Sequence, residues 1–217
     1  MTAQDIVSKY FPELTADQQH QLELMGAVYP EWNEKINVIS RRDIDNLYIN
    51  HVLHSLVIAR FWGALQPGTT VLDLGTGGGF PGIPLAVLYP EVKFHLIDRI
   101  GKKLMVASEV VKALGLKNVT IQHGDVGECH DRFDYVVSRA VMPLDKLVKV
   151  SARNVARGRR GINRYDNGIV CLKGGDLTEE SAAVTYPVIE FSLNEFVSEP
   201  AFDTKKLVYV PIVTNKK

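Results

Sequence analysis

The sequence predicts an α/β fold in which a mainly parallel β-sheet, covered by helices on both faces, follows an N-terminal helical extension. Three observations support this prediction. Apolar residues recur at helical spacing in the first third of the chain, and from Thr69 onward short apolar runs alternate with helical segments. A glycine-rich segment follows the first of these runs, as in sheets that bind a nucleotide-like ligand. We expect residues 1–66 to form the extension and residues 67–217 to form one compact unit.

The expected elements follow from periodicity and from turn residues. Two helices open the chain, at 15–36 and 44–65, with Thr15 and Asp43 as capping residues. Strands are expected at 71–74, 92–97, 119–122, 133–138 and 169–173, with late β-rich runs around Val188 and at 207–213. The helices that connect them are expected at 83–88, 102–114, 144–155 and shortly after Asp176.

Composition limits the classes of function. The chain has 217 residues, of which 46% are hydrophobic, so it can bury a full core. Lys+Arg and Asp+Glu are balanced at 25 each, and any case for nucleic-acid binding must therefore rest on the local distribution of charge. No run has the length and apolarity of a transmembrane helix, and the N-terminus lacks the pattern of a signal peptide. We expect a cytoplasmic, monomeric protein with no membrane association.

The cysteines and histidines form no recognisable metal or disulfide motif. Cys129 lies in a polar segment, Cys171 lies inside an apolar run, and neither has a C-x-x-C neighbour. Cys171 has the surroundings of a buried strand residue rather than of a nucleophile. His51 and His54 share a helical face without an evident third ligand. We therefore expect neither a structural disulfide nor a metal site.

The glycine-rich segment begins at Asp73 and has the sequence DLGTGGGFPG. Glycine accepts positive φ and lets a ligand approach bare backbone. Gly75 and Gly77 fit the dinucleotide pattern G-x-G-x-x-G, but Phe80 stands at the third glycine. The pattern D-x-G-x-G-x-G, which starts at Asp73, is instead typical of S-adenosylmethionine (SAM) sites. A carboxylate suits the ammonium and sulfonium of SAM and would oppose a pyrophosphate, so the segment favours SAM.

A second carboxylate supports a nucleoside ligand. Asp98 ends the second predicted strand and follows Gly75 at about the 20-residue spacing at which such folds place an acid on ribose hydroxyls. Both NAD and SAM contain ribose, so Asp98 does not choose between them. It also suits the N-cap of the helix that follows.

Ligands of parallel α/β sheets bind beyond the carboxyl ends of the strands, where the strand order reverses. This rule adds residues from the third, fourth and fifth strands to the candidate site. The third strand is followed by Gly124 to Gly127, the fourth ends in Ser138-Arg139-Ala140, and the fifth ends in Lys173-Gly174. Arg139 and Lys173 are therefore cations placed where a polar substrate would approach, or else partners in salt bridges.

Several motifs together resemble one family, the bacterial 16S rRNA guanine-N7 methyltransferases, also called glucose-inhibited division protein B. The resemblance covers about Trp32 to Asp176. It rests on G-F-P-G-I-P-L from Gly79 to Leu85, on S-R-A at Ser138 to Ala140, and on Trp32-Asn33, His51-Val52-Leu53 with Ser55, Asp98 with Gly101-Lys102-Lys103, Phe133-Asp134, and Leu172-Lys173-Gly174. His54 departs from it, because many members have an acidic residue there.

The resemblance implies a Rossmann-like, SAM-dependent methyltransferase fold that methylates N7 of a guanine in 16S rRNA, either as free rRNA or within the small ribosomal subunit. It also implies the residues that bind SAM. Together with Asp73 from the glycine-rich pattern, these are Gly75, Gly77, Phe80, Asp98, Val126, Gly127 and Arg139.

The chemistry of guanine N7 agrees with the residue types at the predicted site. N7 carries an in-plane lone pair and no proton, so methyl transfer needs alignment and desolvation rather than a general base. No Asn-Pro-Pro-Tyr or Asp-Pro-Pro-Tyr motif of exocyclic-amine methyltransferases occurs. We expect Arg139 and Lys173 to be the catalytic residues, which orient a phosphate or the guanine O6.

Two other classes of function remain open. A nicotinamide-dependent dehydrogenase is disfavoured by Phe80 and Asp73. A non-catalytic rRNA-binding assembly factor would be indicated by rRNA binding without SAM turnover.

A loop rich in arginine precedes the fifth predicted strand. This arginine-rich loop either binds RNA phosphates or is a solvated segment, and in the second case we expect another set of basic residues to bind the RNA. The loop contains Arg153, Arg157, Arg159, Arg160 and Arg164, and the other set is Arg41, Arg42, Lys102 and Lys103.

Overall fold

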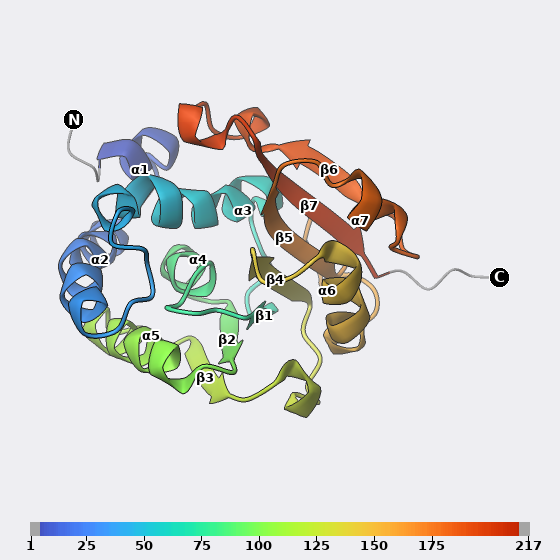
Figure 1. The fold of residues 1–217 in the computed structure, drawn as a ribbon, viewed down its shortest axis with the longest axis horizontal. Coiled ribbons are helices and arrows are strands. Elements are labelled where there is room, and N and C mark those ends of the chain that lie inside the picture. Colours follow the sequence, from blue (N-terminus) through green and yellow to red (C-terminus); the bar gives the residue numbers. More distant parts are fainter. Residues whose placement is uncertain (1–4, 213–217) are drawn as a thin grey trace.

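The computed structural model describes residues 5–212, which form a seven-stranded sheet flanked by helices (Figure 1). The strand order is β3-β2-β1-β4-β5-β7-β6, and β7 is antiparallel to both of its neighbours, β5 and β6. The other pairings are parallel, so the predicted mainly parallel α/β sheet is confirmed. The strands are β1 (Thr70–Leu74), β2 (Lys93–Asp98), β3 (Val119–His123), β4 (Tyr135–Arg139), β5 (Gly168–Gly174), β6 (Ile189–Ser192) and β7 (Lys205–Pro211).

Helices cover both faces of this sheet. Apolar strand residues alternate between the two faces, because successive side chains of a strand point to opposite sides. Val71, Val137 and Leu172 belong to one buried cluster with helices from the first half of the chain. Leu72 and Val136 belong to another with α6 and with Leu177, the residue before α7. The helices are α1 (Asp5–Tyr10), α2 (Ala16–Lys35), α3 (His54–Trp62), α4 (Gly82–Leu88), α5 (Gly101–Ala113), α6 (Leu144–Ser151) and α7 (Thr178–Ala182).

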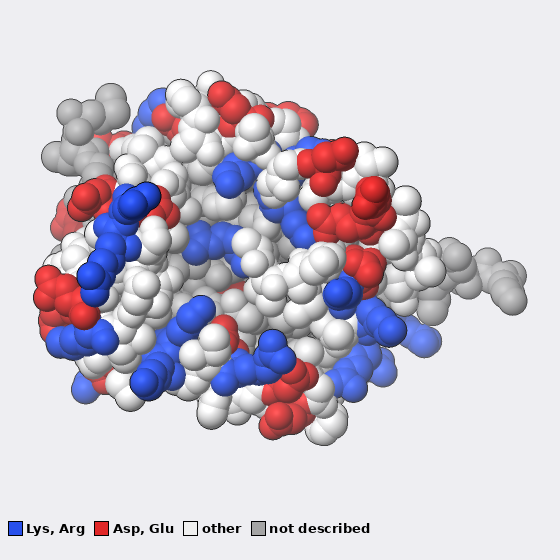
Figure 2. All heavy atoms as spheres, in the orientation of Figure 1, with Lys and Arg blue, Asp and Glu red and all other residues white. Residues whose placement is uncertain are grey.

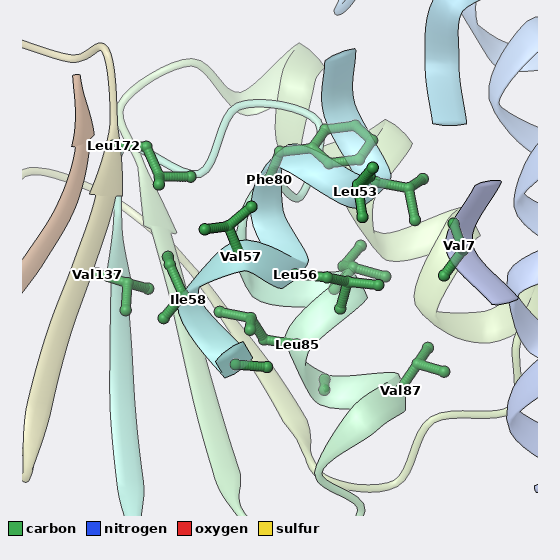
Figure 3. Close-up of a cluster of buried hydrophobic side chains, with 14 of the residues drawn as sticks. Val7, Leu53, Leu56, Val57, Ile58, Phe80, Leu85, Val87, Val137 and Leu172 are labelled. Atoms are coloured by element: carbon green, nitrogen blue, oxygen red, sulfur yellow. The ribbon is translucent and has the colours of Figure 1, made fainter. Parts of the chain in front are cut away.

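Helix α3 is the centre of the first cluster. Its Leu56, Val57 and Ile58 are fully buried. Figure 3 shows them between α4, represented by Leu85, and the sheet, where Val137 lies. Burying such side chains contributes about 1.5–3 kcal/mol each. The helices that precede β1 therefore share one core with the strands.

The segment predicted as a single helix at 44–65 has three parts. A 3₁₀ turn (Ile44–Asn46) leads into a π-helix (Leu47–Leu53), which continues directly as α3. Apolar spacing did not indicate the π-helix, because π-helical turns are rare and occur mostly as short pieces inside α-helices. The predicted helix at 144–155 likewise ends early, and a 3₁₀ turn follows it at Ala152–Asn154.

Helix α1 was not predicted, and it packs against a distant part of the chain. The Tyr10 hydroxyl donates a hydrogen bond to the carbonyl of Ser198 at 2.9 Å, and Lys9 forms an ion pair with Glu199 at 2.7 Å. Thr15 caps α2 as expected, in a capping box with Gln18. Of the late β-rich run predicted at 207–213, Val213 lies outside the described residues.

The arginine-rich loop lies at the amino ends of the strands, because it leads directly into the start of β5. Arg160 Nε donates to Asp134 Oδ2 at 2.7 Å, and the same oxygen accepts a hydrogen bond from Thr70 N at 2.9 Å. The guanidinium of Arg164 lies over the Tyr165 ring, 5.2 Å from its centroid. Part of this loop therefore ties down the end of the sheet that is opposite to the glycine-rich turn.

Candidate active site

A cavity of about 540 Å³ opens at the carboxyl ends of β1, β2 and β4. The strand order reverses between β1 and β4, which is where open α/β sheets bind their ligands. Figure 2 shows a hollow near the middle of this face, with Lys and Arg side chains on its floor and around its rim. Its lining includes Val38, Gly75, Gly77, Phe80, Asp98, Lys103, Val126, Arg139 and Val141.

The glycine-rich turn brings bare backbone to the cavity. Gly75 and Gly77 have φ of +70° and +57°, a left-handed conformation that favours glycine. A Cβ at Gly75 would lie 2.6 Å from Val141 Cγ2, whereas a Cβ at Gly77 would find no atom nearer than Lys103 Cδ at 3.9 Å. Gly75 is therefore required by both conformation and space, and Gly77 faces an open part of the cavity.

Asp73 lies beneath this turn, is fully buried and does not line the cavity. Its Oδ2 accepts hydrogen bonds from Thr76 Oγ1 at 2.6 Å and from Gly82 N at 2.7 Å. Burial raises the pKa of Asp73 to about 7, although both hydrogen bonds and the charge of Arg139 favour its ionised form. Asp73 thus joins the two ends of the turn.

Asp98 holds the turn from the side of the cavity. Its Oδ2 accepts a hydrogen bond from Gly77 N, and its Oδ1 accepts one from Ile100 N, both at 2.8 Å. Of the two residues after the third strand that were predicted to bind the cofactor, only one lines the cavity. Val126 lines the cavity, while Gly127 lies outside the lining and donates its N–H to Asp125 Oδ1 at 2.8 Å.

Phe80 and Arg139 meet at the floor of the cavity. The Phe80 ring stacks on Tyr29 with centroids 4.7 Å apart, and the Arg139 guanidinium lies 5.0 Å from the Phe80 centroid. Burial lowers the pKa of Arg139 to about 10, with Asp73 acting in the opposite direction. Arg139 therefore remains charged at neutral pH.

A second cavity, of about 280 Å³, adjoins the first. Its lining includes His54, Arg139, Ala140, Val141, Met142, Lys173, Glu180 and Lys205. The segment from Arg139 to Met142 lines both cavities and contains Ala140 at φ +52°, an uncommon conformation for a residue with a Cβ. Lys173 lines only the second cavity, where its Nζ donates to the Met142 carbonyl at 2.9 Å and to Glu180 at 2.5 Å.

The structure brings most of the predicted site residues together and adds residues that sequence reasoning missed. Arg139 donates from Nη2 to His51 Nδ1 at 2.9 Å and from Nη1 to the Asn50 carbonyl at 3.2 Å. Asp43 accepts from His51 Nε2 at 2.6 Å. The sequence signal for this cluster was weak, since Asp43 has the pattern of a helix cap and His51 is one residue of a longer motif.

His54 has different surroundings from His51. It packs on the Phe202 ring with centroids 5.4 Å apart, and burial lowers its pKa to about 3. Among residues 5–212, no group of three or more His, Cys, Asp or Glu side chains is placed to hold a metal ion, and both cysteines are free and buried. In the same range no helix has the length and apolarity needed to cross a membrane.

Comparison with known proteins identifies a family for most of this chain. The family model described as GidB, rRNA small subunit methyltransferase G, matches residues 18–186. A Bacteroides thetaiotaomicron protein named Ribosomal RNA small subunit methyltransferase G is 53% identical over 208 residues, which cover 96% of this chain and 100% of that protein. The protein of the same name from Porphyromonas gingivalis is 51% identical, covering 96% of this chain and 93% of its own.

Solved structures with lower sequence identity have a similar fold. A mutant of MtNAS in complex with S-adenosylmethionine is 15% identical and has a TM-score of 0.56, over 89% of this chain and 76% of that one. A precorrin-6y C5,15-methyltransferase from Geobacter metallireducens is 14% identical with a TM-score of 0.53, over 81% of this chain and 90% of that one. These structures support the Rossmann-like fold.

Proposed function

This chain belongs to the rRNA small subunit methyltransferase G family, and from that premise we propose that it transfers the methyl group of SAM to N7 of a guanine in 16S rRNA. One observation carries the proposal beyond family membership. Two adjoining cavities share the segment from Arg139 to Met142, and the first has the glycine-rich turn while the second has a partly buried lysine. A cofactor and an acceptor base can therefore meet at Arg139.

The residues around the first cavity fit SAM. Its volume lies in the range of small-molecule sites, and the turn at Gly75 and Gly77 exposes backbone to the ligand. We assign the ribose hydroxyls to the Asp98 carboxylate, one face of the adenine to Val126, and the base of the pocket to Phe80. Asp73 supports this set by closing the turn, and Gly127 by holding the loop of Val126. SAM supplies an electrophilic methyl group when it is bound.

The second cavity offers donors to an acceptor guanine. Arg139 has five N–H groups, of which two donate to Asn50 and His51. The others remain for the O6 edge of the base or for a phosphate, and Lys173 faces the same space. Methyl transfer would form the N7–CH3 bond from the N7 lone pair while the S–CH3 bond of SAM breaks and S-adenosylhomocysteine leaves. No proton has to be removed, so these residues have to align the base and exclude water.

The target guanine must leave its stack to reach this site, because N7 lies in the deep, narrow major groove of A-form RNA. The rRNA backbone then needs positive charge near the rim of the cavity. Lys103 lines the cavity and Lys102 precedes it on α5. Arg41 and Arg42 are exposed on the segment that carries Val38, another lining residue. We propose that these four residues bind phosphates and that the enzyme acts as a cytoplasmic monomer.

Methyl transfer from tritiated SAM tests the function. The protein is incubated with 16S rRNA, either naked or in small subunits, and the labelled base is mapped. We expect label at N7 of one guanine, and loss of label with Lys173→Ala. Label on another atom would contradict the position, and rRNA binding without any label would indicate an assembly factor. Binding of NADH in place of SAM would indicate a dehydrogenase.

A further inference from the structure

We propose that Asp43 and His51 are positioning residues that fix the guanidinium of Arg139 between the two cavities. They act through a chain of hydrogen bonds that runs from Asp43 through His51 to Arg139, and Asn50 closes this chain into a ring. The inference deepens the proposed function, on which its activity readout rests. The arrangement itself rests on the geometry of these four residues alone.

The hydrogen-bond chemistry allows one tautomer of His51. A carboxylate can only accept and a guanidinium can only donate. His51 Nε2 lies 2.6 Å from Asp43 Oδ2, so Nε2 must carry the ring proton. His51 Nδ1 lies 2.9 Å from Arg139 Nη2, so Nδ1 must present its lone pair. A doubly protonated ring would set an N–H against the N–H of Arg139.

The surroundings keep this ring neutral. The His51 side chain is 12% exposed, and burial together with the nearby charge of Arg139 lowers its pKa to about 4, with Asp43 acting in the opposite direction. The charged and titratable groups that face Arg139 are Asp43, Asp73 and Tyr29, and His54 lies on the neighbouring turn. At neutral pH His51 is therefore an acceptor for Arg139.

Asn50 closes the ring of hydrogen bonds. Its Nδ2 donates to Asp43 Oδ1 at 2.6 Å, and its carbonyl accepts from Arg139 Nη1 at 3.2 Å. Both Asn50 and His51 lie on the π-helix Leu47–Leu53, and such turns are frequent at functional sites. The π-helix directs the carbonyl of one residue and the ring of the next toward the same guanidinium.

Fixing Arg139 in advance has a physical benefit. An unrestrained arginine has to lose side-chain freedom when it binds substrate, whereas a guanidinium already held by two acceptors has less to lose. The charge of Asp43 also offsets part of the cost of burying Arg139. The N-terminal helical segment thus contributes to the site through these polar contacts as well as through its apolar packing.

Arginine side-chain NMR tests the arrangement without SAM or rRNA. A guanidinium held at both Nη atoms rotates slowly, so Arg139 is expected to give separate Nη signals in the wild type. His51→Leu removes the acceptor and is expected to merge them, whereas His51→Gln retains an acceptor oxygen and is expected to keep them apart. Asp43→Asn removes one of the two acceptor oxygens in use and should broaden them. Unchanged signals in His51→Leu would overturn the proposal.

Methyl transfer at saturating SAM gives the second readout. We expect His51→Leu to lower the rate by about 10- to 100-fold, the usual effect of misplacing a reacting group, and His51→Gln to lose less. In an Arg139→Ala background His51→Leu should have no further effect, because His51 acts through Arg139. Additive losses would assign His51 to the fold and overturn the proposal.

His95→Gln is the matched control. His95 bonds to Thr120 and Gln122 through its two ring nitrogens and lines neither cavity, so its loss should leave the Arg139 signals and the rate unchanged. If the wild type gives the expected NMR signals but methylates no rRNA, the proposed function fails while the positioning role stands.

Discussion

Glu180 joins Lys173 to the start of α6. It forms the 2.5 Å ion pair with Lys173 and also accepts a hydrogen bond from the backbone N–H of Leu144. Lys173 further donates to the carbonyl of Met142, so the end of β5 is tied to the segment that leaves β4. The side chains of Lys173 and Glu180 are 11% and 21% exposed, which limits solvent screening of the pair.

Because of where Lys173 lies, we expect Lys173→Ala to reduce methyl transfer more than SAM binding. We expect Arg139→Ala to reduce both. Lys173 lines only the second cavity, whereas Arg139 lines both. Calorimetry with SAM and steady-state rates with rRNA measure the two effects. Lys206→Ala is the control, because Lys206 pairs with Glu190 at 2.8 Å and lines neither cavity. Equal losses of SAM affinity in the two site variants would contradict this division.

Replacing Gly77 by Arg should abolish SAM binding and leave the fold intact. The new side chain would enter the open space above the turn, at a backbone φ of +57° that costs about 1 kcal/mol for a residue with a Cβ. Gly115→Arg is the matched control, since Gly115 has φ +66°, has open space around it and lies away from the cavity. Calorimetry and thermal melting decide the outcome. Normal SAM affinity in a folded Gly77→Arg variant would remove the cofactor assignment.

Asp98→Ala should weaken SAM by about 1.5–3 kcal/mol, the range for hydrogen bonds to a charged group. The expected loss of affinity for methionine is smaller, because methionine lacks the ribose. Some loss is expected even there, since Asp98 also holds Gly77 N in place. Titration calorimetry with both ligands separates the two contributions. An equal loss for both would restrict Asp98 to holding the turn.

Stability should depend on pH through Asp73. Its pKa is about 7 in the folded protein, above the ordinary value of 3.8, so the fold favours the protonated form. The contribution of Asp73 to stability is greatest below its unfolded pKa and is lost as the pH rises toward 7. Between pH 5 and 7.5 the loss is about 2–3 kcal/mol. Urea unfolding of Asp73→Asn should show a smaller fall over this range, and an identical fall would show that Asp73 does not titrate there.

Neutralising Arg41, Arg42, Lys102 and Lys103 should reduce the dependence of rRNA affinity on salt. With four contacts the slope of log affinity against log salt should fall by up to about 3, from about 0.7 per phosphate on single strands. Neutralising Arg157 and Arg159 is the control, because their loop lies at the amino ends of the strands. If the slope fell only in the variant neutralised at Arg157 and Arg159, the RNA-binding surface would be assigned to that loop instead.

The centre of the sheet was predictable because β1, β4 and β5 are mainly apolar runs. Strands buried on both faces show no alternation. Both the buried β4 and the partly exposed β2 end in recognisable polar residues, Arg139 and Asp98. The rule that ligands bind at the carboxyl ends of strands then located the cavity. What the sequence could not show was the pairing of β7 in the opposite direction to β5, because an apolar run carries no sign of its direction.

The same limit applies to the site. Gly75 and Gly77 were predictable from a local pattern, but the role of His51 depends on Arg139, which lies far along the chain. Contacts of that kind arise only when helices dock on the sheet, and no local spacing encodes them. Asp73 illustrates a different limit, since the pattern indicates that a carboxylate is needed without indicating whether it faces the ligand or the turn.

Helix α1 has a consequence for how the chain acquires its structure. Its polar partners, Ser198 and Glu199, are separated from Tyr10 and Lys9 by about 190 positions in sequence. During synthesis α1 leaves the ribosome long before these partners exist, and a helix of 6 residues is too short to persist alone. Its apolar residues contact the π-helix at 47–53, which is close in sequence, but its polar contacts with Ser198 and Glu199 can form only when the polypeptide is nearly finished.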